Sequence, residues 1–158
     1  MPAFGKRSES NLITCCSHLQ RLARVVVVKF DCSVLWGRRG KEPQDLAFKN
    51  GWTTKPWPES IHNAEAPKLS KAMDLEPYPI NFKDKQREYY FSGYVRGKAE
   101  ELELRLRYGS DWDGDFDIND QVLRDPCHFE CAEESCQEIE PQDEQLDGGK
   151  KDVNRTSV

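Results

Sequence analysis

The sequence predicts an α+β fold for most of a chain of 158 residues. Residues 8–27 and 84–102 carry apolar side chains at helical spacing, which predicts two long helices. Short apolar segments of strand length lie between and after them, separated by glycines and prolines. A chain of this length can bury one core, so we expect one domain. The expected strands are residues 33–36, 72–75, 104–108 and 127–131.

The first helix is expected to run without a break from Ser8 to about Val27. Ser8 or Ser10 can serve as its N-cap, because a serine hydroxyl accepts a hydrogen bond from a free backbone N–H of the first turn. The apolar residues that define its buried face are Leu12, Cys16, Leu19, Ala23 and Val26.

A strand and a short helix are expected next. The strand at residues 33–36 ends at Gly37. Pro43 suits the first turn of a helix, where the missing N–H of proline would have had no helical partner. This helix is expected to reach Asn50 and to be closed by Gly51.

The second half of the chain begins with a proline-containing polar loop at residues 52–67. A strand at residues 72–75 follows, and Pro77 and Pro79 end it. The longest helix is expected at residues 84–102. On its inward face we expect Tyr90, Phe91, Tyr94 and Val95.

The net charge of −5 averages two different parts of the chain. Residues 133–158 hold eight acidic and three basic side chains, which leaves 20 of each sign for residues 1–132. A neutral body carries no basic footprint for nucleic acid. The acidic segment is poor in apolar residues, so we predict a disordered tail at 133–158 after a domain at 1–132.

No apolar run approaches the length of a membrane span, and the longest covers only residues 25–28. The N-terminal residues also lack the apolar core of a signal peptide. We therefore expect a soluble protein that is made in the cytoplasm, has no membrane partner and works as a monomer.

The most informative pattern is a set of three separated residues, His62, Asp74 and His128. Two histidines and one aspartate are a natural ligand set for catalytic zinc, which leaves a fourth position for water. Asp74 and His128 lie in apolar strands, where an unpaired polar group is costly to bury. A salt bridge is the alternative to a metal for these two residues, and a solvated loop histidine is the alternative for His62.

Two carboxylates lie near His128 in the sequence. Asp125 precedes a proline that keeps the chain extended, and it could act as a general base beside the metal. A turn aspartate is the alternative. Glu130 shares the strand face of His128 and could orient that histidine or touch substrate, unless it is a surface residue. Cys127 and Cys131 flank His128, but alternation along a strand directs both thiols away from it.

Arg39 and Gln44 lie between the expected strand at residues 33–36 and the following helix. An arginine there can hold a carboxylate or a developing oxyanion. Considered alone, a solvated arginine is the simpler interpretation.

The segment Asp111–Asp120 has oxygen ligands at alternating positions, as calcium loops do. Its glycine is not at the EF-hand position, and no bidentate glutamate follows at the required place. A tight polar turn is the simpler interpretation, and a Ca²⁺ site is the alternative.

Taken together, these motifs resemble those of zinc peptidases that cut bacterial peptidoglycan stems. This family includes D-alanyl-D-alanine carboxypeptidases and phage L-alanyl-D-glutamate endopeptidases. The resemblance extends over roughly residues 4–132. The family patterns S-x-H…A-x-D and D-x-x-H correspond to Ser60-Ile-His62…Ala72-Met-Asp74 and Asp125-Pro-Cys-His128, a segment similar to LRWGGDWDGDG begins at Leu106, and one similar to G-x-R-x-x-x-x-Q runs from Gly37 to Gln44.

The resemblance implies a small antiparallel sheet with flanking helices, like that of hedgehog domains and D-Ala-D-Ala peptidases. It also implies a murein endopeptidase with Zn²⁺ as its cofactor and peptidoglycan as its substrate, acting as a phage or prophage endolysin on the cell wall after release. The implied roles are zinc binding for His62, Asp74 and His128, base catalysis for Asp125, oxyanion stabilisation for Arg39, and substrate or supporting contacts for Ser60, Gln44 and Glu130.

The chain departs from the family pattern in one loop. The gap between His62 and Asp74 is longer than in the shortest pattern, and the usual glycine between them is missing. Three alternatives stay open: a carboxypeptidase or dipeptidase of the same family, a non-catalytic relative that binds murein, and a calcium-binding protein without hydrolytic activity.

Overall fold

The computed structural model describes residues 2–132. The predicted acidic tail, residues 133–158, lies outside the described residues. None of the helices within residues 2–132 has the length and apolarity needed to cross a membrane.

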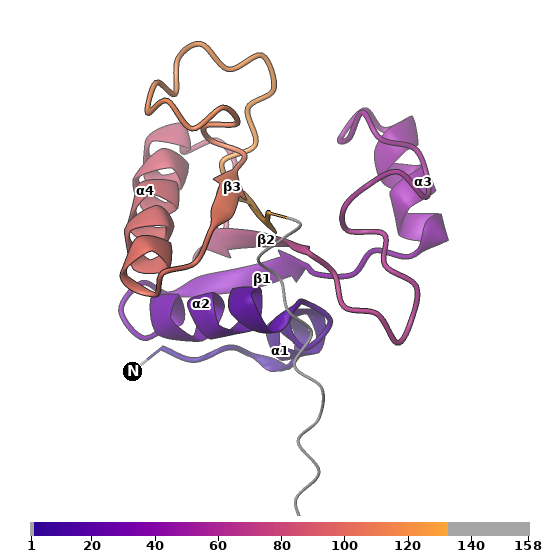
Figure 1. Ribbon diagram of the computed structural model, residues 1–158, viewed down its shortest axis with the longest axis horizontal. Coiled ribbons are helices and arrows are strands. Elements are labelled where there is room, and N and C mark those ends of the chain that lie inside the picture. The colour runs from indigo at the N-terminus through magenta and orange to yellow at the C-terminus, as the bar shows by residue number, and fades with distance from the viewer. Residues whose placement is uncertain (1, 133–158) are drawn as a thin grey trace, which may run out of the picture.

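One antiparallel sheet of four strands organises the described part of the chain (Figure 1), in the order β1-β2-β4-β3. The predicted α+β class and all four predicted strands are confirmed, with shifts of one or two residues at their ends. The strands are β1 (Cys32–Trp36), β2 (Ala72–Pro77), β3 (Leu106–Tyr108) and β4 (His128–Cys131).

Three of the four helices within residues 2–132 pack against this sheet. Helix α1 (Lys6–Leu12) packs along the edge strand β1, and α2 (Ser17–Val27) and α4 (Lys85–Glu101) pack against the sheet and each other. Figure 1 shows α3 (Lys41–Lys49) set apart from the sheet, as part of the segment that joins β1 to β2. As predicted, Gly51 closes α3, with a φ of +71° that glycine adopts easily.

The predicted single N-terminal helix is wrong, because α1 and α2 are separate. Cys16 has an extended backbone, and its N–H donates to the carbonyl of Ser70 at 2.8 Å. The N–H of Ser70 donates in turn to the carbonyl of Thr14 at 2.8 Å. This pairing with a distant segment replaces the helical hydrogen bonds of one turn. The apolar pattern still marks the core, because Leu12, Cys16, Leu19, Ala23 and Val26 are all buried.

The inward face of α4 differs from the prediction at one residue. Phe91 and Val95 are fully buried, whereas Tyr90 is 73% exposed. The buried positions of α4 are Glu88, Phe91, Ser92, Val95 and Ala99, a stripe of helical spacing that leaves Tyr90 outside it. Tyr94 packs partly buried against the core.

The register of the central strand β2 places the candidate site. Asp74 is the Cα partner of Trp36 on one side and of His128 on the other. Residues opposite each other in a sheet direct their side chains to the same face. Asp74 and His128 are therefore brought together by strand pairing, although 54 positions separate them.

Candidate active site

The side chains of Asp74 and His128 meet on the sheet face that bears the candidate site. His128 Nδ1 lies 3.0 Å from Asp74 Oδ1. Both residues are buried, in agreement with the prediction that apolar strands hold them.

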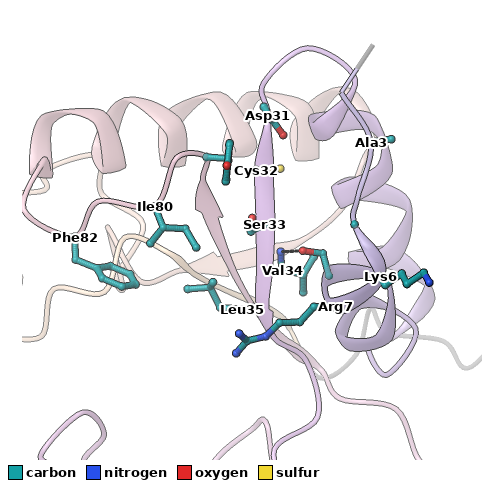
Figure 2. A pocket seen from close by; sticks show the side chains of 13 residues that line it. Ala3, Lys6, Arg7, Asp31, Cys32, Ser33, Val34, Leu35, Ile80 and Phe82 are labelled. Atoms are coloured by element: carbon teal, nitrogen blue, oxygen red, sulfur yellow. Dashed lines mark hydrogen bonds between the residues drawn. The ribbon is translucent and has the colours of Figure 1, made fainter.

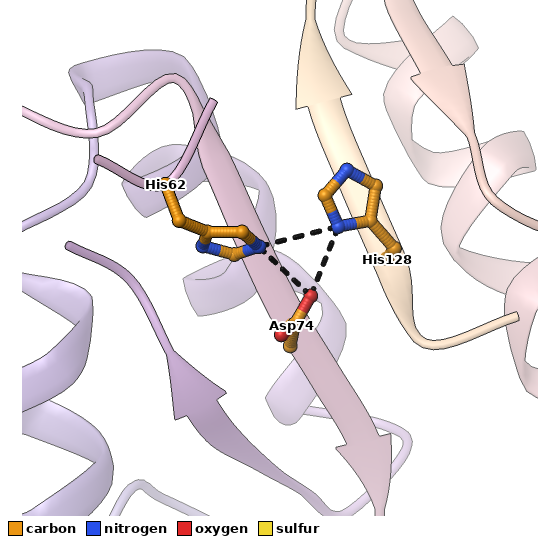
Figure 3. A group of neighbouring side chains, drawn as sticks. All are labelled: His62, Asp74 and His128. Carbon is orange, nitrogen blue, oxygen red and sulfur yellow. Dashed lines mark hydrogen bonds and ion pairs between the residues drawn. The ribbon is translucent and has the colours of Figure 1, made fainter. Parts of the chain in front are cut away.

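His62 completes the group from the loop before β2. Its Nε2 lies 3.2 Å from Asp74 Oδ1 and 3.2 Å from His128 Nδ1 (Figure 3). Its Nδ1 donates to the carbonyl oxygen of Gly37, 2.7 Å away, which leaves the Nε2 lone pair directed at the other two residues. The three residues identified in the sequence therefore converge, despite the long gap between His62 and Asp74.

Gly37 is a tight point in the chain that holds His62. A Cβ at this position would lie 2.4 Å from Asn11 O and 2.4 Å from Thr14 Oγ1. Only glycine allows β1 to pass this close to the end of α1. The same segment bonds the loop twice, because the Arg39 N–H also donates to the His62 carbonyl at 2.8 Å.

The three converging atoms are spaced as the ligands of one ion would be. Their mutual distances are 3.0, 3.2 and 3.2 Å. Tetrahedral ligands about 2.0 Å from a zinc ion are separated by roughly 3.3 Å. The group of His62, Asp74 and His128 could therefore hold a metal ion.

Arg39 binds the second oxygen of Asp74. Its NH2 group donates to Asp74 Oδ2 at 3.0 Å, and its NH1 donates to Gln44 Oε1 at 3.3 Å. Gln44 is fully buried and also donates from Nε2 to the Lys55 carbonyl at 2.6 Å. Gln44 thus ties α3 and its following loop to the arginine. The Nε of Arg39 is buried without a hydrogen-bond partner in the described part of the chain.

Ser60 organises the loop that carries His62. Its Oγ accepts from the His62 N–H at 3.3 Å, and its own N–H donates to Asn63 Oδ1 at 3.1 Å. Sequence reasoning missed Asn63, whose Nδ2 donates to the Arg39 carbonyl at 2.9 Å and to Gln44 Oε1 at 3.1 Å. Its position next to His62 was the only signal.

Glu130 holds the far side of His128. Its Oε2 accepts from His128 Nε2 at 3.0 Å, so that Nδ1 faces Asp74. The other oxygen, Oε1, accepts from Arg107 NH1 at 2.6 Å. Of the two roles expected for Glu130, the contacts match the orienting one. Sequence reasoning missed Arg107, although β3 pairs it directly with Glu130.

Asp125 lies beside the group in the turn before β4. Its N–H donates to the Gly109 carbonyl at 2.9 Å, and its own carbonyl accepts from the His128 N–H at 3.0 Å. Its Oδ1 accepts a hydrogen bond from Cys127 Sγ at 3.2 Å. Burial and the charge of Asp74 raise the pKa of Asp125, which suits a carboxylate that must take up a proton.

The protonation of the group reflects its opposed charges. Burial alone would raise the pKa of Asp74, but the two imidazoles outweigh burial and hold that pKa well below its usual range. Burial alone would lower the pKa of His128, but hydrogen bonds to Asp74 and Glu130 raise it to about 10. A metal ion would take the place of the proton that these partners now stabilise.

A second group of carboxylates lies in the predicted calcium segment. Asp111, Asp113 and Asp115 have oxygens within 4.8 Å of one another. Asp111 is already bonded, because Arg96 NH1 donates to its Oδ2 at 2.6 Å and the Gly114 N–H donates to its Oδ1 at 2.9 Å. The loop is thus a tight polar turn, as the simpler interpretation predicted, and it could also hold a cation.

A pocket of about 620 Å³ lies at the outer edge of β1, between the N-terminal segment and residues 78–82 (Figure 2). Arg7, Leu35 and Ile80 are among the residues that line it. None of the site residues predicted from the sequence lines this pocket. It is therefore separate from the group of His62, Asp74 and His128.

Comparison with known proteins identifies the family. The family model of phage L-alanyl-D-glutamate peptidases matches residues 2–132. The chain belongs to the phage L-alanyl-D-glutamate peptidase family. This membership confirms the resemblance seen in the motifs, and it makes the protein a peptidase.

Two individual relatives agree with this family. The L-alanyl-D-glutamate peptidase of Escherichia phage T5 is 26% identical over 126 residues, which are 77% of this chain and 89% of the phage T5 protein. The crystal structure of the Serratia marcescens L-Ala D-Glu endopeptidase ChiX superposes with a TM-score of 0.62 and 21% identity. It covers 83% of this chain and 91% of ChiX, so the two proteins share a fold.

Proposed function

We propose that this peptidase is a zinc-dependent murein endopeptidase that hydrolyses the L-Ala–D-Glu bond of peptidoglycan stem peptides. The observation that carries the proposal is the convergence of His62, Asp74 and His128, with Asp125 beside them, in a chain of the L-alanyl-D-glutamate peptidase family. The relatives named above support the choice of bond, because both are described as peptidases of L-alanyl-D-glutamate.

His62 Nε2, Asp74 Oδ1 and His128 Nδ1 would hold the zinc ion. When bound, zinc acts as a Lewis acid and lowers the pKa of water to about 7. The donor set fits because each histidine has its other ring nitrogen bonded, His62 to Gly37 and His128 to Glu130. Each ring is thereby fixed with one nitrogen facing the shared position.

Asp125 performs the proton transfers. Its carboxylate accepts a proton from the attacking water and then donates a proton to the leaving amine of the cleaved peptide bond. The raised pKa of Asp125 favours the first of these steps, because a carboxylate with a higher pKa is a stronger base toward the attacking water. The backbone bonds of Asp125 to Gly109 and His128 hold it at the site.

Arg39 binds Asp74 Oδ2, the carboxylate oxygen that does not face the two histidines. Its NH2 group fixes Asp74, and its buried Nε–H has no partner among the described residues. We assign Arg39 the role of stabilising the substrate oxygen that gains negative charge, because its guanidinium is the cation bonded to Asp74. Gln44 and Ser60 act one step away, by holding Arg39 and the His62 loop.

The biological setting follows from the family. We propose that the protein acts as a phage or prophage endolysin, works as a monomer, and reaches the cell wall after release from the cytoplasm. The substrate is peptidoglycan, and neither nucleic acid nor membrane is a partner.

Calcium at Asp111–Asp120 stays a secondary prediction. Asp113 and Asp115 are exposed, and Asp111 already has a cationic partner in Arg96. If calcium binds there, thermal stability should rise with added Ca²⁺, and the variant Asp113→Asn with Asp115→Asn should abolish that rise. An equal response in the variant would contradict the prediction.

Digestion of purified peptidoglycan tests the proposed bond. The zinc-loaded protein should release fragments with new D-Glu amino termini, detected by mass spectrometry, and chelation should stop the release. Loss of terminal D-Ala alone would instead identify a carboxypeptidase. Zinc binding without any cleavage would favour the murein-binding alternative.

A further inference from the structure

Arg107 on β3 contacts Glu130, the residue that holds the far side of His128. Strand pairing sets Arg107 opposite Glu130. Arg107 NH1 donates to one oxygen of Glu130 at 2.6 Å, and the other oxygen accepts from His128 Nε2 at 3.0 Å. A guanidinium, a carboxylate and an imidazole thus form a continuous chain that ends at the nitrogen facing Asp74.

The same guanidinium also lies against an aromatic ring beside the histidine. Arg107 Cζ is 5.3 Å from the centre of the Trp112 ring, within range of a cation–π contact. The Trp112 ring packs in turn against His128, with ring centres 5.4 Å apart. Trp112 is fixed independently, because its Nε1 donates to the Leu123 carbonyl at 2.8 Å. Arg107 therefore contacts both side chains that flank His128.

The Glu130 carboxylate is buried between Arg107 and His128. Glu130 is only 7% exposed, and a buried carboxylate is costly without a cationic partner. Arg107 NH1 and His128 Nε2 are the groups bonded to its two oxygens. Without Arg107, Oε1 of this buried carboxylate would lose that hydrogen bond, and Glu130 would be held less firmly against His128.

We propose that Arg107 is a positioning residue of the metal centre, which holds the Glu130 carboxylate in place so that His128 presents Nδ1 to the ion. The proposal rests on the zinc site proposed above. If Arg107 acts in this way, replacing it should weaken zinc binding only while Glu130 is present, whereas a purely structural role would not depend on Glu130.

The test measures the zinc Kd by competition with a chromophoric chelator in Arg107→Met, Arg107→Lys, Glu130→Gln and the double variant Arg107→Met with Glu130→Gln. Arg107→Met should weaken zinc binding by about 10-fold or more, the range found for residues that support metal ligands. Arg107→Lys should recover part of the loss, because lysine keeps the charge but not the planar fork. In the Glu130→Gln background, Arg107→Met should change the Kd by less than about 2-fold.

Arg24→Met is the control, because Arg24 on α2 forms an arginine–glutamate ion pair with Glu9 on α1, a carboxylate more exposed than Glu130. It should leave the zinc Kd unchanged, and thermal unfolding in chelator should show that all variants fold. An unchanged Kd in Arg107→Met, or an equal loss in the Glu130→Gln background, would overturn the role of Arg107 alone. A wild-type protein that binds no zinc would overturn the proposed metal site, and this inference with it.

Discussion

His128 and Asp74 are Cα partners in neighbouring strands, and their facing atoms Nδ1 and Oδ1 lie 3.0 Å apart. Strand pairing, rather than a flexible loop, therefore fixes one edge of the proposed metal site. Because paired strands hold these two side chains in place, replacing one of them should lower zinc affinity without first displacing the other.

Asp74→Asn should remove most of the zinc affinity. The substitution deletes the only carboxylate charge of the set and leaves two imidazoles facing an amide, so the Kd should rise by more than about 100-fold. Competition with a chelator measures it. Asp45→Asn, at an exposed residue of α3, should bind zinc as the wild type does, and a similar Kd for Asp74→Asn would contradict the ligand assignment.

Zinc affinity should increase with pH. The pKa of His128 is raised from 6.5 to about 10, so zinc binding near neutral pH must release that proton. Below pH 10 the apparent affinity should rise by about tenfold per pH unit for this one proton. Kd values measured between about pH 6 and about pH 9 check the slope, and a Kd independent of pH would contradict it.

Without metal, the same shift should make stability depend on pH in the opposite sense. A pKa raised in the folded state contributes stability that is fully present below 6.5 and is lost as the pH rises through about 10. Thermal unfolding of the chelated protein should therefore show a fall across this window that zinc removes. His128→Gln should not show this fall.

Glu76→Gln should stabilise the protein at neutral and alkaline pH. Glu76 is 1% exposed, and burial together with the charge of Glu88 raises its pKa from 4.5 to about 7. Between pH 4.5 and 7 the carboxyl ionises readily in the unfolded chain but not in the folded one. The wild type therefore loses up to about 3 kcal/mol of stability across this window, and the variant does not. Denaturant unfolding at acidic and alkaline pH measures the difference. The control Glu65→Gln, at an exposed residue, keeps Glu76 and should therefore lose stability with rising pH as the wild type does.

Gly109→Ala should impair catalysis by displacing the proposed base. A Cβ on Gly109 would lie 2.1 Å from the carbonyl oxygen of Asp125, which cannot stay in place. Misplacement by about 1 Å can cost about 100-fold in rate, so murein cleavage should fall by that order. Gly93→Ala is the matched control, because a Cβ there meets nothing within 4 Å. Equal activity of the two variants would contradict the role of this close approach.

The strands and the three residues that converge at the candidate site, His62, Asp74 and His128, could be predicted from the sequence, because each is marked locally. Asp74 and His128 are polar residues inside apolar strands, and such residues need a partner wherever the strands pair. The break between α1 and α2 could not be predicted, because it depends on pairing of Cys16 with Ser70, far along the chain. Helical periodicity passes through such a break unchanged.

The supporting residues were harder to predict than the proposed ligands. Arg107 is an ordinary charged residue in sequence, and its contact with Glu130 exists only because β3 and β4 pair in one register. The bond from Arg39 to Asp74 likewise joins segments on either side of α3. Residue type suggested that Arg39 would meet a carboxylate, but not that the carboxylate would be a proposed metal ligand.

The most direct test of the account compares murein cleavage and bound zinc in the wild type and in Asp125→Ala. Asp125 has no ligand atom in the group of His62, Asp74 and His128, so its loss should leave zinc in place. We predict that Asp125→Ala retains one zinc ion per chain and loses cleavage. A variant that cleaves peptidoglycan at the wild-type rate would contradict the proposed base, and one that loses zinc would contradict the proposed ligand set.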